Sequence, residues 1–303
     1  MEFRNLNQYK AFIKSEAHRL GISPTSAYTT YYARLLLQRM AEVNYGILVV
    51  KGSFSQFVHL KELSRPVLDI DLSSTIDRQV PLETLYTAIY NSEDEIVTFD
   101  INRIPRQTEN GIYKMVINAI VRYPNDKEMI IPIPIDFKAN NPVIFETQFK
   151  GVEPLFKGDK KFYINTPSFE EHIAEKLYII FHNRRQDIIN TRVKDFYDIY
   201  KLHGKDYDPD KFNLYFQAML LMYGENLQDL DAEFLNKKFI KRHEGIWSRM
   251  QEKYEFTDRS VELDEAIYYT KAVLKEQIQR IRSKENVEEA AKLVRQKQQK
   301  MQK

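Results

Sequence analysis

Hydrophobic and polar positions follow two different rhythms along the chain, and the change between them falls near Thr166. At the start, apolar residues recur at helical spacing over residues 3 to 20 and 25 to 43. The Gly21–Pro24 segment separates these stretches, because Gly and Pro end helices. The pattern predicts a helical hairpin, which either packs on the rest of the fold or offers a surface to a partner.

From residue 45 to Thr166 the apolar runs are short or alternating, as is typical of β-strands. We expect strands over residues 45–50, 67–72, 95–104, 113–123 and 129–137, and a helix over 81–90. The last of these strands contains Pro132 and Pro134, which cannot donate hydrogen bonds to a neighbouring strand. Its pairing should therefore be at a sheet edge or interrupted.

Beyond Thr166 the pattern is helical to the end of the chain. Ser168 with Glu171 three residues later forms a capping box that predicts a helix start. Helices are then expected over 191–202, 212–223 and 234–250, where Trp247 would anchor the core, and from about residue 260 onward. The end, 295–303, has four cations and no acid, so we expect a frayed basic tail.

These patterns predict an α+β protein with a mixed β-sheet core, flanking helices and a mainly helical C-terminal domain. The expected domains are residues 1–165 and 166–303. A chain of 303 residues with 43% hydrophobic content is long enough for two domains.

Composition narrows the functional classes. The net charge of +2 hides an asymmetry, since residues 271–303 carry ten Lys or Arg against four Glu. The chain has no cysteine, which excludes disulfides and thiolate metal sites and suits a reducing compartment. We find no signal segment and no apolar run of membrane-spanning length, so we expect a cytoplasmic protein without a membrane partner.

The segment Lys51-Gly52-Ser53 is the first candidate for chemistry. It follows an apolar strand, Gly52 permits a sharp turn, and Ser53 would open a helix. A helix N-terminus offers unpaired N–H groups and the positive end of a dipole. We therefore expect this turn to bind a phosphate group.

Carboxylates follow on the next expected strand. Asp69 and Asp71 would point to the same face, with their Cα atoms roughly 7 Å apart. Two like charges this close favour a shared counter-ion, and Mg²⁺ is the usual one beside substrate phosphates. Asp136, at the end of the strand over 129–137, is a candidate third ligand. The alternatives are a solvated strand face for the pair and a turn acid for Asp136.

The helical region adds two candidate residues. Lys176 projects along the apolar stripe of its helix, so it must reach solvent along that stripe or point into a polar cleft. Asp195 lies on the apolar line of the helix over 191–202, whereas Asp198 lies between Lys194 and Lys201. We therefore expect Asp195 to face a cleft and Asp198 to belong to a solvated, ion-paired surface.

In this order, the motifs resemble those of the AbiEii-type nucleotidyltransferases, a family that includes the MenT toxins of type IV toxin-antitoxin and abortive-infection systems. The matching segments are Leu20–Pro24, Val50–Ser53, Arg65–Pro66 before Asp69–Asp71, Ile135–Asp136, Ile173–Leu177 and Arg192–Asp198. They span residues 20 to 202, and the C-terminal third carries no matching motif.

The resemblance implies a nucleotidyltransferase-like fold and a role for each matched residue. Gly52 and Ser53 would hold the triphosphate of an NTP, and Asp69 and Asp71 would hold Mg²⁺ or Mn²⁺. Asp136 would be the third metal ligand or the base. Lys176 and Asp195 would contact the nucleotide and the reacting groups.

The implied reaction transfers a nucleotide from an NTP to an acceptor, which is tRNA for the MenT members, and the implied partner is a winged-helix antitoxin. Phosphoryl transfer mainly requires positioned groups and metals that neutralise charge, which these residue types can provide.

Three alternatives remain open from the sequence. The acceptor could be a protein or a small molecule, since the motifs describe only the donor side. The chain could bind nucleotides as an interaction protein without catalysis, or it could be a helical adaptor in which the Asp69 and Asp71 pair is incidental.

Overall fold

A computed structural model describes residues 3–44, 46–76, 79–90, 96–108, 111–124, 126–141, 144–185, 192–202 and 204–301. The chain divides into two compact units. The N-terminal unit comprises Met1–Asn141 and Thr147–Pro167, and the C-terminal unit comprises Pro142–Glu146 and Ser168–Lys303. The main division thus falls after Pro167, and a short segment before β6 belongs with the helical part.

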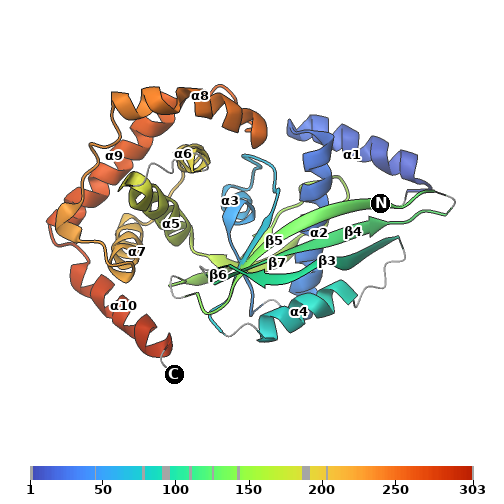
Figure 1. Ribbon diagram of the computed structural model, residues 1–303, viewed down its shortest axis with the longest axis horizontal. Coiled ribbons are helices and arrows are strands. Elements are labelled where there is room, and N and C mark those ends of the chain that lie inside the picture. Colours follow the sequence, from blue (N-terminus) through green and yellow to red (C-terminus); the bar gives the residue numbers. More distant parts are fainter. Residues whose placement is uncertain are drawn as a thin grey trace. The chain divides into compact units, whose positions relative to one another are not determined.

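The N-terminal unit is built on a seven-stranded mixed sheet with the order β3-β4-β5-β2-β1-β7-β6 (Figure 1). The strands are β1 (Val49–Val50), β2 (Ile70–Ser73), β3 (Val97–Gln107), β4 (Ile112–Val121), β5 (Met129–Lys138), β6 (Thr147–Val152) and β7 (Phe162–Pro167). Two pairs are parallel, β2 with β5 and β1 with β7, and the other pairs are antiparallel. The expected mixed sheet is confirmed.

The long strand β5 explains how its prolines are accommodated. It pairs with β4 over its whole length, but its register with β2 begins only at Ile135. Pro132 and Pro134 therefore lie where β5 has one neighbour, and the expected interruption of pairing is confirmed.

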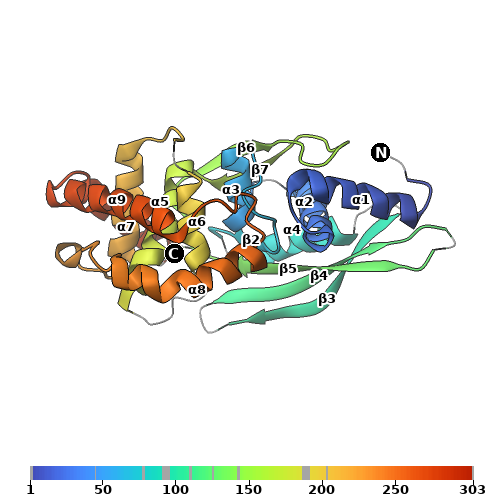
Figure 2. The same ribbon diagram turned by 90° about the horizontal axis from the view of Figure 1, so that it is seen from above.

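Helices cover the apolar face of this sheet. They are α1 (Leu6–Leu20), α2 (Pro24–Asn44), α3 (Gly52–Leu60) and α4 (Gln79–Tyr90). The Asn5 side chain caps α1, and the predicted hairpin of α1 and α2 packs into the core. In Figure 2, α1, α2 and α4 lie on one side of β3, β4 and β5. Ile133, Ile135 and Leu72 are among the sheet residues buried against them.

The C-terminal unit is helical. Its helices are α5 (Phe169–His182), α6 (Val193–Tyr200), α7 (Pro209–Met222), α8 (Lys237–Lys253), α9 (Leu263–Arg282) and α10 (Val287–Met301), with short 3-10 helices over Asn183–Arg185 and Leu227–Asp229. Ser168 caps α5 as predicted, accepting from Glu171 N. Trp247 is buried, and its indole N–H donates to the Val261 carbonyl.

The expectation of a frayed C-terminal tail is wrong for residues 295–301. A turn with left-handed Lys284 and Asn286 ends α9, and the chain then continues as α10. Ala290 and Val294, four residues apart, are buried against Ala218 of α7. Lys297 donates to the carbonyl of Ile144. A narrow apolar stripe within a polar sequence is therefore enough to pack α10 against α7. Residues 302–303 lie outside the described residues.

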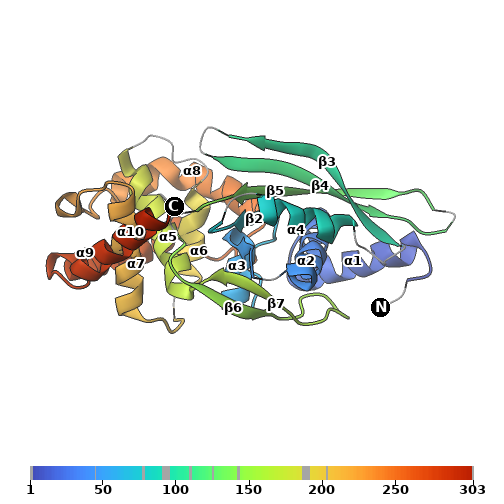
Figure 3. The same cartoon turned by 90° about the horizontal axis from the view of Figure 1, so that it is seen from below.

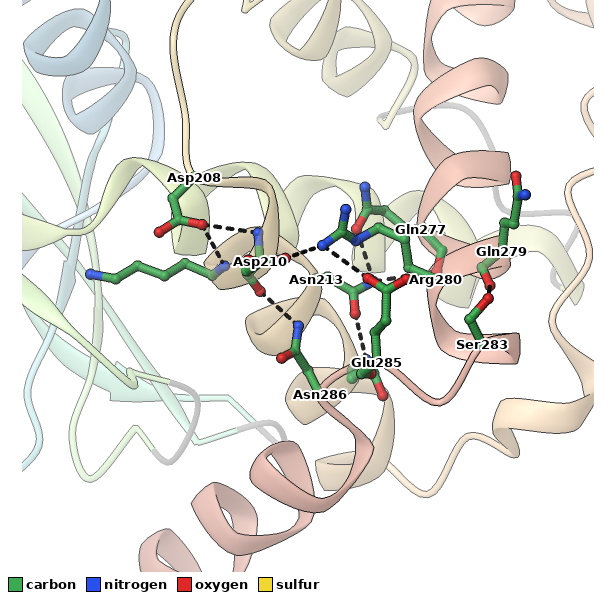
Figure 4. A network of polar contacts seen from close by, with 11 residues as sticks. Asp208, Asp210, Asn213, Gln277, Gln279, Arg280, Ser283, Glu285 and Asn286 are labelled. Carbon is green, nitrogen blue, oxygen red and sulfur yellow. Dashed lines mark hydrogen bonds and ion pairs between the residues drawn. The ribbon is translucent and has the colours of Figure 1, made fainter.

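A polar network joins α7, α9 and the turn before α10 (Figure 4). Asn213 Nδ2 donates to Gln277 Oε1 at 3.0 Å, and Gln217 Nε2 donates to the Glu285 carbonyl at 2.7 Å and to Asn213 Oδ1. Arg280, which pairs with Asp210 and Glu285, lies beside it. The three amide side chains are fully buried, so each depends on the others for its hydrogen bonds.

Replacing Asn213 with alanine should therefore destabilise the protein by about 1–3 kcal/mol, because Gln277 Oε1 loses its donor in a buried site. The measurement is the free energy of unfolding in urea. Gln279→Ala, at an exposed position of α9, is the matched control and should change it by less than about 0.5 kcal/mol. Equal effects of the two substitutions would show that the network does not contribute to the free energy of unfolding.

Candidate active site

The turn between β1 and α3 brings a helix start against a carboxylate. Lys51 N–H donates to the Asp71 carbonyl at 2.8 Å, which holds the turn beside β2. Gly52 has φ +61°, and a Cβ built on it would lie 2.7 Å from Asp71 Cγ and overlap Oδ2. Only glycine permits both this backbone conformation and this close approach. The predicted strand, turn and helix are confirmed, although the described strand is only Val49–Val50 and Tyr45 lies outside the described residues.

Ser53 lies in the first turn of α3. Its side chain is 4% exposed, and its Oγ has no hydrogen-bond partner among the described residues. No side chain caps the helix at Lys51. A buried hydroxyl and the first N–H groups of a helix are thus available to an anion at this turn.

Asp71 and Asp136 are neighbours in the sheet. They occupy opposite register positions of the parallel strands β2 and β5, so their side chains point to the same face. On the next strand, Lys114 is the register partner of Asp136, and its Nζ lies 3.2 Å from Asp136 Oδ2. The lysine side chain is 60% exposed, so this pair holds it weakly and the carboxylate stays available.

Asp69 is placed differently from the expectation. It precedes β2, which begins at Ile70, and it is partly exposed. The alternation is confirmed for Ile70, Asp71 and Leu72, but it is wrong for Val67. Val67 is fully buried, and its N–H donates to the Thr30 hydroxyl at 3.1 Å. A hydrogen bond to a helix therefore replaces the first part of the strand.

Within the described parts of the chain, no group of three or more His, Asp or Glu side chains is arranged to hold a metal ion. The structure thus brings together Asp71 and Asp136, and it leaves Asp69 two residues before Asp71, ahead of β2. Mg²⁺ is commonly bound by one or two carboxylates together with substrate phosphates, so the pair provides a suitable protein share of such a site.

The C-terminal unit holds a second cluster of charges, built around Lys176 of α5. Its Nζ donates to Asp198 Oδ2 at 2.6 Å and lies 3.7 Å from Asp195 Oδ1. The lysine side chain is only 9% exposed, and the two carboxylates are buried more deeply. Asp195 Oδ2 has no hydrogen-bond partner among the described residues, and Arg192 Nη1 lies 3.7 Å from it.

The expectation that Asp198 lies on a solvated face is wrong. The short helix α6 contacts α5, α8 and α9, so nearly all of its circumference is covered. The lysines that suggested a solvated face have other partners. Lys194 lies over the Tyr254 ring, and Lys201 Nζ lies 3.7 Å from Asp258 Oδ2. Asp198 is thus a member of the cluster that sequence reasoning missed, and the apolar residues on every side of α6 were the available signal.

A mixed sheet that carries acids on adjacent strands beside a Gly-Ser helix start defines a nucleotidyltransferase-like protein, and solved structures share this fold. A putative nucleotidyltransferase from H. pylori matches with a TM-score of 0.52 and 14% identity, covering 86% of this chain and 98% of its own. MenT4, a nucleotidyltransferase toxin from Mycobacterium tuberculosis H37Rv, matches with a TM-score of 0.52 and 16% identity, covering 89% and 97%. No curated protein matches the sequence.

The sequence model described as "Nucleotidyl transferase AbiEii toxin, Type IV TA system" matches residues 34–281. The chain therefore belongs to this family of nucleotidyltransferase toxins. Membership of a type IV toxin-antitoxin family implies that a cognate antitoxin exists. No described helix has both the length and the apolar character needed to span a bilayer.

Proposed function

We propose that the protein transfers a nucleotide from an NTP to an RNA acceptor, tRNA by analogy with the MenT toxins, in a reaction that requires Mg²⁺ or Mn²⁺. The observation that carries this proposal is the contact of Gly52 with the Asp71 carboxylate, with Asp136 in register beside it. The contact puts the start of α3 next to two acids, so a triphosphate and a divalent cation would have protein ligands in one place.

In this proposal, the first N–H groups of α3 and the Ser53 hydroxyl bind the triphosphate, which satisfies the buried oxygen that otherwise lacks a partner. Asp71 and Asp136 hold the cation, with Asp69 as a further ligand once the substrate is bound. The cation neutralises charge on the phosphates and orients them. Asp136 pairs with the exposed Lys114 and lies on the same face of the sheet as Asp71, so we also assign it to accept the proton of the acceptor.

The proposal assigns Lys176 and Asp195 to the same reaction, as the family resemblance implies. A lysine held by two buried carboxylates has a fixed direction, which suits a group that binds a phosphate or the leaving pyrophosphate. Asp198 positions Lys176 in this scheme. For the partner, we propose a winged-helix antitoxin.

The test is incorporation of each α-labelled NTP into total tRNA by the purified protein, with Mg²⁺, with Mn²⁺ and with EDTA. We expect label in the RNA fraction with at least one NTP and its loss with EDTA. Label that appears in added protein or in a small molecule would favour the alternative acceptors. Nucleotide binding without any transfer would favour the silent interaction protein.

A further inference from the structure

Two aromatic rings stack on each other at the surface of the β6–β7 hairpin. Phe149 is 54% exposed and Tyr163 is 48% exposed, with ring centroids 5.3 Å apart and an interplanar angle of 21°. Large aromatic rings are mostly buried, and exposed apolar groups that lie together can mark a binding surface. β6 is an edge strand of the sheet (Figure 3).

Gly151 makes room for this pair and for a cation. It is the register partner of Tyr163, and a Cβ on it would lie 2.5 Å from Lys161 Cε and 3.5 Å from a Tyr163 ring carbon. The Lys161 side chain therefore lies across the glycine, with Nζ 5.9 Å from the Tyr163 ring centroid. The hairpin thus presents two ring faces with an ammonium group beside them.

Lysines outnumber acids around the rings. Lys61 and Lys161 are exposed, and Glu153 is the acid beside them, its carboxylate accepting from Lys161 Nζ at 2.6 Å. Lys161 and, more weakly, Lys61 lower the pKa of Glu153, which places both lysines near it. This excess of positive charge beside the rings is complementary to a phosphate backbone.

The rings share a face of the sheet with the candidate active site. Asp71 and Ser73 are two residues apart on β2, and Ser73 pairs with Val49 of β1. Val49 pairs in turn with Asn165 of β7, whose partner on β6 is Phe149. Paired residues point to the same face of the sheet, so Phe149 and Asp71 share a face. Their Cα atoms are separated by three strand spacings across the sheet and two residues along it, which is roughly 16 Å. A few nucleotides of extended chain cover such a span.

We propose that Phe149 and Tyr163 form a stacking platform for unpaired bases of the RNA acceptor, with Lys61 and Lys161 contacting its phosphates. This deepens the proposed function and rests on it for the identity of the acceptor as RNA. Any unpaired base can stack on an aromatic ring, whereas the bases of a duplex already stack on each other, so the platform favours single-stranded RNA. Neither stacking nor the contact of a lysine with a phosphate depends on the identity of the base, so we expect no sequence preference.

The test measures binding of a labelled single-stranded oligoribonucleotide and of the same strand in a duplex, by fluorescence anisotropy. Phe149→Ala and Tyr163→Ala should each weaken single-strand binding by about fivefold to a hundredfold, and Tyr163→Phe, which keeps the ring, should retain it. Lys161→Gln should lower the slope of log K against log salt by roughly 0.7 for one lost phosphate contact. Tyr90→Ala, at a 62% exposed tyrosine on α4, is the matched control and should bind as wild type does.

Transfer assays separate this inference from the proposed function. The alanine variants should raise KM for RNA and leave KM for the NTP and the turnover at saturating RNA unchanged. Unaltered RNA binding and KM in both variants would overturn the platform even if the enzyme labels RNA, and would leave the β6 edge as a site for a protein strand. A wild-type protein that binds single strands through the rings but labels no RNA would instead overturn the proposed function.

Discussion

Replacing Asp71 with asparagine should lower nucleotide transfer at least about a thousandfold, equivalent to about 4 kcal/mol of activation free energy, while the protein remains folded. Asparagine keeps the shape that packs against Gly52 and removes the charge that a cation requires. The substitution also relieves repulsion with the neighbouring carboxylate of Asp136. We therefore expect a melting temperature equal to or above that of the wild type, so that activity and stability move in opposite directions.

The measurement is the initial rate of label transfer, with thermal unfolding of the same samples without added metal. Asp136→Asn should lose activity to a similar degree, and Asp69→Asn tests whether the acid before β2 joins the site. Gly52→Ala should lose both activity and stability, since its Cβ would displace the Asp71 carboxylate. Transfer by Asp71→Asn within tenfold of wild type would contradict the assignment of the acids.

The parts of this site that the sequence predicted are those fixed by local chemistry. The turn at Gly52 needs a glycine after a strand and before a helix, and these features are adjacent in the chain. The start of α5 is likewise encoded by Ser168, whose side chain caps it. The other half of the expected capping box does not form, because Glu171 binds the backbone of Phe145 and Glu146 instead. That partner lies 25 residues away and leaves no local signal.

Features that depend on long-range pairing could not be predicted in the same way. The strand order puts Asp136 beside Asp71, but the sequence suggested only that both follow strands. Residues 147–152 and 162–167 were not predicted as strands, so the stacked pair of Phe149 and Tyr163 was missed. Helical periodicity failed at Asp198 for a related reason, since a helix surrounded by three others has no solvated face to detect.

Asp198 provides the second large effect, because it is the closest partner of a buried cation. Asp198→Ala should destabilise the protein by about 3–5 kcal/mol, since Lys176 would keep only Asp195, at 3.7 Å. Lys275→Ala is the matched control, because its ion pair with Glu233 at 2.7 Å joins two largely exposed side chains. It should change the free energy of unfolding by less than about 1 kcal/mol.

A triple variant separates stability from activity. In Lys176→Met with Asp198→Leu and Asp195→Asn, neutral groups replace all three buried charges, so most of the lost stability should return. Transfer should nevertheless stay at background, because the charged group assigned to the phosphates is gone. Asp195→Ala should also abolish transfer. The measurements are urea unfolding and label transfer on the same preparations. A triple variant that regains stability and transfers at near wild-type rates would show that the buried cluster only holds α5 and α6 together.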